Sequence, residues 1–128
     1  MKSNNATGLV FVLGTVLLTV AGQLLIKRGM TQIGSLPVVT RGLPAFIWTV
    51  LTNPSNFSGL ACAFLAALCW MAALTKCELS FAYPFTGLTV VLTLVLSSAF
   101  FGERVQAGQW LGVLLVCLGI WLSASFAK

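Results

Sequence analysis

Four long stretches of this chain carry no charged side chain, and they limit the folds open to it more than any other feature. They cover residues 7–26, 58–75, 79–102 and 105–127. A helix of about 20 apolar residues, rising 1.5 Å per residue, crosses the roughly 30 Å hydrocarbon core of a bilayer. The chain has 128 residues, so little is left for a water-soluble part. The pattern predicts an all-α membrane protein with four transmembrane helices.

Composition and charge support this prediction. Hydrophobic residues make up 59% of the chain and charged residues only 7%, whereas soluble domains carry roughly a quarter charged residues. Seven basic residues against two carboxylates, Glu78 and Glu103, give a net charge of +5. The basic residues lie at the ends of the apolar runs, as residues flanking membrane spans do, and do not cluster. We therefore expect membrane lipids around the protein and no nucleic acid as a partner.

The spans are expected at about residues 7–27, 58–75, 79–102 and 105–127, within a single domain of residues 1–128. The last three are joined by very short turns, which predicts antiparallel neighbours in a four-helix bundle. Residues 29–57 contain Pro37, Pro44 and Pro54 and are expected to be mostly loop. Within them, residues 43–51 are apolar but too short to span. We expect a short interfacial helix there, between the first and second spans, with Trp48 at the headgroups.

The charges at the helix ends do not choose an orientation. With the N-terminus in the cytoplasm, three basic residues would lie inside and four outside. The inside set is Lys2, Lys76 and Lys128, and the outside set is Lys27, Arg28, Arg41 and Arg104. The positive-inside rule needs a clear excess on one side. Either orientation, or both, is compatible with the sequence.

Polar residues inside the spans point to a candidate site. On the first span Thr15, Thr19, Gln23 and Lys27 recur every four residues and so share one helix face. On the third span a looser cluster contains Tyr83, Thr86, Thr89, Thr93 and Ser97. The threonines have an alternative role in bonding to helix backbone, and Lys27 has one in reaching out to the headgroups. An amide and an ammonium facing lipid are costly, which favours a shared polar cavity.

Small residues on the fourth span suggest a contact surface. Gly108 and Gly112 form a GxxxG motif, and Gly119 follows seven residues after Gly112 on the same face. Such a face allows close helix crossing, either in a dimer or inside the bundle. The four cysteines form no CxxC pair and there is no His, so we expect small packing side chains, no metal and no cofactor. An enzyme is the least favoured class, because no paired carboxylates or activated nucleophile occur.

Three segments resemble the drug/metabolite transporter superfamily, in particular its four-helix EamA-like and small multidrug resistance proteins. They are residues 20–27, then Trp70 with residues 79–84, and residues 101–104 with 108–112, continuing to Gly119. In small multidrug resistance proteins a glutamate in the first span couples drug export to protons. The matching residue here is Thr19, which argues against that coupling. The chain looks closer to the small subunit pair that flips undecaprenyl-phosphate-linked aminoarabinose across the bacterial inner membrane.

The resemblance implies a flippase for a polyprenyl-phosphate-linked sugar in the bacterial cytoplasmic membrane, working as a dimer with itself or with a paralogous subunit. In the expected site Thr19, Gln23, Lys27 and Tyr83 face one cavity. Lys27, Arg28 or Arg104 would hold the phosphate, and Glu103 would bind an amino-sugar or a helix-end cation. The alternatives are a small multidrug resistance-type exporter of cationic or metabolite solutes, and a scaffold subunit that transports nothing.

Overall fold

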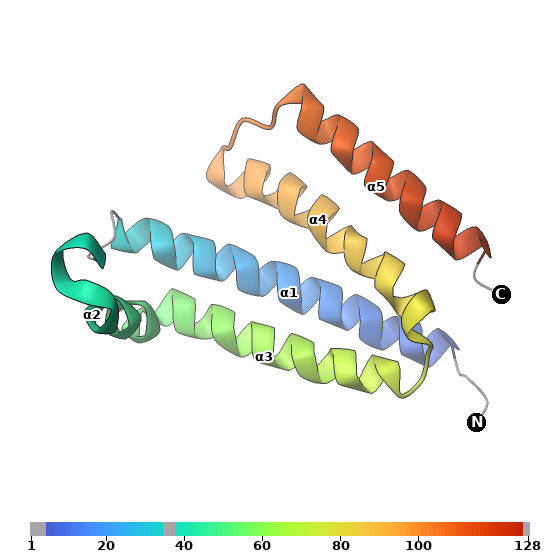
Figure 1. Cartoon of the computed structure of the whole chain (residues 1–128), viewed down its shortest axis with the longest axis horizontal. Coiled ribbons are helices and arrows are strands. Elements are labelled where there is room, and N and C mark those ends of the chain that lie inside the picture. The colour runs from blue at the N-terminus through green and yellow to red at the C-terminus, as the bar shows by residue number, and fades with distance from the viewer. Residues whose placement is uncertain (1–4, 35–37, 127–128) are drawn as a thin grey trace.

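A computed structural model of the protein describes residues 5–34 and 38–126, and this part of the chain folds into five helices (Figure 1). They are α1 (Asn5–Ile33), α2 (Val38–Thr52), α3 (Pro54–Leu74), α4 (Leu79–Phe101) and α5 (Ala107–Phe126). Helices α1, α3, α4 and α5 are long and apolar enough to cross a membrane. The prediction of four spans with a shorter helix between the first and second is confirmed. Lys2, Pro37, Ala127 and Lys128 lie outside the described residues.

The expectation that residues 29–57 are mostly loop was wrong. Helix α1 continues to Ile33, and α2 and α3 together cover most of the remainder. Proline is tolerated in the first turn of a helix, where its missing N–H needs no partner, so prolines here begin helices. Pro54 opens α3, whose N-cap Asn53 accepts hydrogen bonds from the backbone N–H of Ser55 and Asn56. Pro44 follows a break in α2 at Gly42, which has φ 79°.

Helix α2 exposes its apolar side chains on one side. Leu43, Ile47, Trp48 and Leu51 are between 46% and 73% exposed, and their spacing places them on one face of the helix. An apolar face on a helix too short to span is typical of a segment lying in the membrane interface.

The spans form a row in the order α5, α4, α1, α3 (Figure 1). Helix α1 therefore lies between α3 and α4 and packs on both, whereas α5 packs on α4 alone among the described helices. The short turn between α3 and α4 does make them antiparallel. They touch only near that turn because α1 separates them. The expectation that the last three spans are each neighbours of the next was therefore wrong for this pair.

Small residues allow α1 and α3 to approach closely. Gly8, Thr15, Gly22 and Gly29 repeat every seven residues along α1. A Cβ at Gly22 would lie 2.9 Å from the backbone oxygen of Gly59, and a Cβ at Gly29 would lie 2.1 Å from Oδ1 of the buried Asn56. Lipid tails are as apolar as leucine, so close van der Waals contact of this kind is what holds membrane helices together.

Three of the four cysteines lie in or near this tight packing, and Cys117 is exposed on α5. All four are free thiols, and Cys77, which is buried, donates a hydrogen bond from Sγ to the Ala73 carbonyl oxygen at 3.2 Å. Cys62 and Cys69 lie on α3 near the glycines of α1. In the described part of the chain no three His, Cys, Asp or Glu side chains gather as metal ligands.

We expect Gly22→Ala to weaken the α1–α3 contact, because its new methyl group would meet a backbone oxygen that cannot rotate away. Overpacking of this kind costs roughly 1–3 kcal/mol. The midpoint of SDS-induced unfolding in mixed micelles, followed by circular dichroism, should fall accordingly. Gly14→Ala on the same helix is the matched control, because its Cβ would lie 3.9 Å from Cys69 Sγ, an ordinary contact. Equal midpoints for the two variants would contradict the expected close contact.

Candidate functional site

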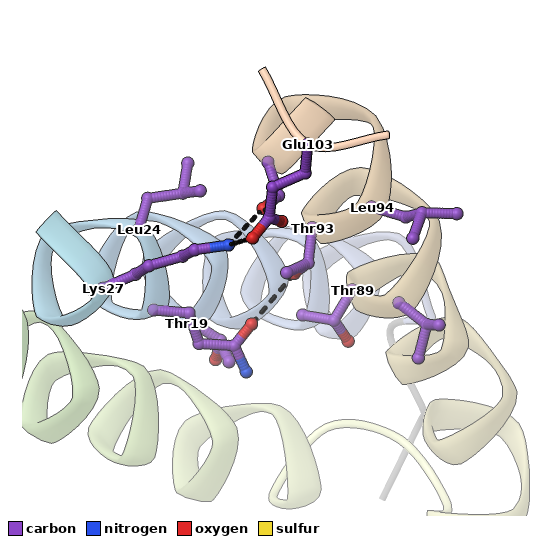
Figure 2. Close-up of a pocket in the computed structure, with 10 residues that line it drawn as sticks. Thr19, Leu24, Lys27, Thr89, Thr93, Leu94 and Glu103 are labelled. Atoms are coloured by element: carbon purple, nitrogen blue, oxygen red, sulfur yellow. Dashed lines mark hydrogen bonds and ion pairs between the residues drawn. The ribbon is translucent and has the colours of Figure 1, made fainter. Parts of the chain in front are cut away.

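A groove of about 590 Å³ lies between α1 and α4 (Figure 2). Helix α1 contributes Thr19, Gln23 and Lys27, which recur every four residues and so face the same way. Helix α4 contributes Thr89, Thr93 and Ser97 with the same spacing, and Glu103 enters from the α4–α5 connection. Leu24, Val90 and Leu94 complete the lining. Three residues from each of the two polar stripes predicted from the sequence therefore line one groove.

At one end of the groove, Lys27 is held by three groups on or beside the last turn of α4. Its ammonium forms an ion pair with the Glu103 carboxylate and donates a hydrogen bond to Ser97 Oγ at 2.9 Å. It also lies 4.8 Å from the ring centroid of Phe101, a cation–π contact. The Ser97 hydroxyl donates in turn to Oε2 of Glu103. Lys27 therefore points across the groove toward α4 and the α4–α5 connection.

Gly102 is the reason that Glu103 returns to α4. It ends the helix with φ 63°, a left-handed conformation that glycine adopts at little cost. The chain reverses there, and the Ser98 hydroxyl donates to the backbone oxygen of Glu103 at 3.1 Å. The carboxylate is thereby directed to Lys27, which lies six residues before the end of α1.

The surroundings of Glu103 favour its charged form. The hydrogen bond from Lys27, then that from Ser97, hold the pKa of the carboxyl below its ordinary value, and the positive charge of Lys27 adds to this effect. Partial loss of hydration opposes the effect without reversing it. The Glu103 side chain is 51% exposed and lies beyond the end of the α4 span, so water screens the pair.

The middle of the groove contains polar groups that lack partners. The Thr93 hydroxyl donates to Oε1 of Gln23 at 2.9 Å. No hydrogen bond within the described residues involves the Gln23 amide nitrogen or the Thr19 hydroxyl. By contrast, Thr15, Thr86 and Thr89 donate to carbonyl oxygens of their own helices, which is the packing role expected as the alternative.

Three of the expected site residues lie elsewhere. Tyr83 is fourteen residues before Ser97 on the same helix, which is about 21 Å along its axis. Its ring packs edge to face on Trp70 at 5.6 Å, so the expectation that it approaches Lys27 was wrong. Arg28 is rotated about 100° from Lys27 and lines a separate groove of about 500 Å³ with Phe100 and Phe101. Arg104 is exposed in the α4–α5 connection.

The glycines of α5 do not serve contacts inside the chain. A Cβ added at Gly108, Gly112 or Gly119 would meet no atom within 4 Å. Helix α5 packs on α4 through Val116 and Ile120, which lie against Gly87. The alternative that these glycines pack within the bundle was therefore wrong, and their face of α5 is open.

Comparison with known proteins identifies the family. Residues 2–125 match the EamA-like transporter family. The chain belongs to this family. No solved structure matches it.

Named relatives of this EamA-like protein cover most of its length. It is 36% identical over 114 residues to the probable 4-amino-4-deoxy-L-arabinose-phosphoundecaprenol flippase subunit ArnF of Aeromonas hydrophila, covering 88% of this chain and 76% of the relative. ArnF of Erwinia tasmaniensis is 34% identical, with 86% and 94% covered. The corresponding subunit ArnE of Pectobacterium atrosepticum is 35% identical, with 83% and 88% covered. The relatives are thus transporter subunits of two kinds, and this EamA-like chain is similar to both.

Sequence reasoning missed two features of the site in this EamA-like protein. Phe101 and Ser97 both contact the Lys27 ammonium, yet only the cluster containing Ser97 was noticed. Phe101 could have been predicted from its position directly before Gly102. The chain reverses at that glycine, so the Phe101 ring lies beside the Glu103 carboxylate. The second missed feature is a groove between α1 and α3 that contains Trp70.

We expect the pKa of Glu103, followed by carboxyl NMR shifts in micelles, to lie below its ordinary value of about 4.5. Because the folded pKa is lowered, the ion pair is fully present above the ordinary value and is lost as the pH falls through the lowered one. Lys27→Met should raise the pKa toward the ordinary value, and Ser97→Ala should raise it by less. Arg104→Ala is the control for general charge effects. A titration that Lys27→Met leaves unchanged would show that the pair does not form.

Proposed function

We propose that this EamA-like protein is a flippase subunit that moves a polyprenyl-phosphate-linked sugar across a bacterial cytoplasmic membrane. The observation that carries the proposal is the α1–α4 groove, which combines a cation with uncharged polar groups on the faces of two membrane-spanning helices. The names of the relatives, which are flippase subunits for an undecaprenyl-phosphate-linked sugar, support it.

The parts of such a substrate correspond to parts of the groove. A lipid-linked sugar carries a phosphate, a ring with hydroxyl groups and a long apolar tail. Lys27 offers the phosphate a positive charge, and Thr19 and Gln23 offer the ring hydrogen bonds. The groove lies on the surface of the row of helices, so the tail can remain in the lipid while the headgroup is inside.

Glu103 occupies the place that the phosphate would take. In the free protein its carboxylate neutralises Lys27, which avoids an unpaired charge at the edge of the hydrocarbon core. On binding, the phosphate would replace the carboxylate, and Glu103 would be released. It lies in the connection, half exposed, so it can be hydrated again at small cost. The exchange keeps Lys27 paired throughout.

The distribution of carboxylates argues against proton-coupled drug export. Glu78 and Glu103 are the two acidic residues of the chain, and both lie outside the spans. Thr19 stands in the middle of α1, and its hydroxyl does not titrate near neutral pH. No acid is therefore placed within a span to be shared by a proton and a cationic drug.

The proposal includes a second subunit. Helix α5 is attached to the other described helices only through α4, and its glycine face is open. Small residues on an open face of a membrane helix allow close crossing by another helix. The relatives are named as subunits of two kinds, which favours a partner that is a copy or a paralogue of this chain.

Removal of the cation should abolish transport. We expect Lys27→Ala to lose at least nine tenths of the translocation rate, and Lys27→Arg to keep part of it because the charge survives with different geometry. Translocation of a polyprenyl-phosphate-linked aminopentose in proteoliposomes can be followed by labelling its amine with a membrane-impermeant reagent. Arg104 is a cation at the same end of the molecule but outside the groove, so the Arg104→Ala variant should transport normally. Full activity of Lys27→Ala would remove Lys27 from the site.

Bulky residues on the glycine face should prevent assembly. We expect Gly112→Leu with Gly119→Leu to lower the cross-linked dimer fraction in detergent severalfold and to abolish translocation. The fold should survive, because a Cβ added at either glycine would meet no other described residue within 4 Å. Cys117→Leu places the same bulk on the opposite, exposed side of α5 and should leave the dimer intact. An undiminished dimer in the double variant would place the interface on another surface.

A further inference from the structure

A second groove, of about 390 Å³, lies between α1 and α3. It shares Thr19 and Gln23 with the α1–α4 groove, so the two are continuous across the face of α1. On the α3 side its wall is built from small residues, and Trp70 lies among them. The lining from α3 is Ala63, Ala66, Ala67 and Trp70.

The two grooves differ in charge. The α1–α4 groove contains Lys27 and Glu103, whereas no charged side chain lines the α1–α3 groove. An anion is therefore favoured in the first groove and an uncharged group in the second, because a charge without a partner in this region is costly. Thr19 and Gln23 stand at the junction of the two.

Two polar groups without a hydrogen-bond partner lie at this junction. The Thr19 hydroxyl and the Gln23 amide nitrogen have no hydrogen-bond partner among the described residues, although both belong to the α1 span. In hydrocarbon an unpaired hydroxyl or amide costs several kcal/mol, so such groups are retained where something else pairs with them. A ligand with several hydroxyl groups supplies both donors and acceptors for them.

We infer that the α1–α3 groove receives the sugar ring while the phosphate stays at Lys27. The inference rests on the proposed function and names the part of the substrate that this groove binds. Along the axis of α1, Gln23 lies about 6 Å and Thr19 about 12 Å from Lys27. A ring joined directly to a phosphate at Lys27 therefore brings its hydroxyls to Gln23 and then to Thr19. The wall of small residues on α3 provides the room for it, whereas Trp70, which packs on Tyr83, lies at the other end of the groove.

A sugar ring with hydroxyl groups can occupy the α1–α3 groove, whereas a lipid that ends at its phosphate has no group to place there. The test compares two lipids, polyprenyl phosphate and the same lipid carrying a pentose. Their affinities for the full chain in nanodiscs are measured by native mass spectrometry. The wild-type protein should bind the pentose-linked lipid about tenfold more tightly than the bare lipid.

Two variants remove the sugar site by different routes. Thr19→Val replaces an unpaired hydroxyl by a methyl group of similar size. Ala67→Phe places a large ring in the groove. Each should reduce the preference for the pentose-linked lipid to about twofold or less, while binding of the bare lipid changes by less than twofold. Ala61→Phe puts the same ring on an exposed position of α3 outside the groove and should keep the full preference. Lys27→Ala should lose both lipids.

The outcomes separate the inference from the proposed function. A wild-type protein that binds neither lipid would refute the proposed function itself. Equal binding of the two lipids by the wild type, or a preference retained in both variants, would overturn the sugar groove and leave the phosphate site standing. An equal loss of both lipids in Ala67→Phe would show that the groove holds the lipid chain, which also overturns the inference.

Discussion

The close contact of α1 with α3 is the interaction on which the rest of this structure depends. In a bilayer, burial of apolar surface between helices gains little, because the lipid is equally apolar. The helices associate where small residues let their backbones approach, and Gly22 against Gly59 is the tightest such backbone contact. This contact uses one face of α1 and leaves the other faces free. Helix α4 packs on one of them, and the grooves form beside it.

The second constraint is that polar groups inside the hydrocarbon region need partners. Several hydroxyls of the spans meet this need within their own helix, as Thr15 and Thr86 do. Lys27 meets it through Glu103, Ser97 and the ring of Phe101. Thr19 and part of Gln23 do not meet it within the described chain, and they lie where the two grooves join. Two departures from the pairing rule thus lie within the site, and a third, the buried Oδ1 of Asn56, lies outside both grooves.

An ion pair at the end of a groove suits a transporter better than a fixed structural link. The pair is partly exposed, so water weakens it, and an incoming anion can compete for Lys27. Glu103 reaches it from a connection that begins at a left-handed Gly102, outside the spans. The α4–α5 connection and the end of α4 therefore act on one cation of α1, although they are far from it in the sequence.

The sequence by itself determined the spans and the polar faces. Runs without charge are stable as helices only in a bilayer, and a period of 3.6 residues puts Thr19, Gln23 and Lys27 on one side whatever surrounds them. It also signalled the glycines of α5 as a contact surface, but left open whether that surface faced inward. The prolines between residues 29 and 57 were misread as loop signals because the same residue can end a helix or begin one.

Only the tertiary structure decided which faces meet. Periodicity within a helix says nothing about its neighbours, and short turns predicted α4 beside α3, whereas α1 lies between them. The partner of Lys27 is 76 residues away, and Tyr83, which the sequence placed in the same cavity, is held against Trp70. Those choices depend on the fit of small and large side chains between helices, a property of pairs of surfaces that no single stretch of sequence contains.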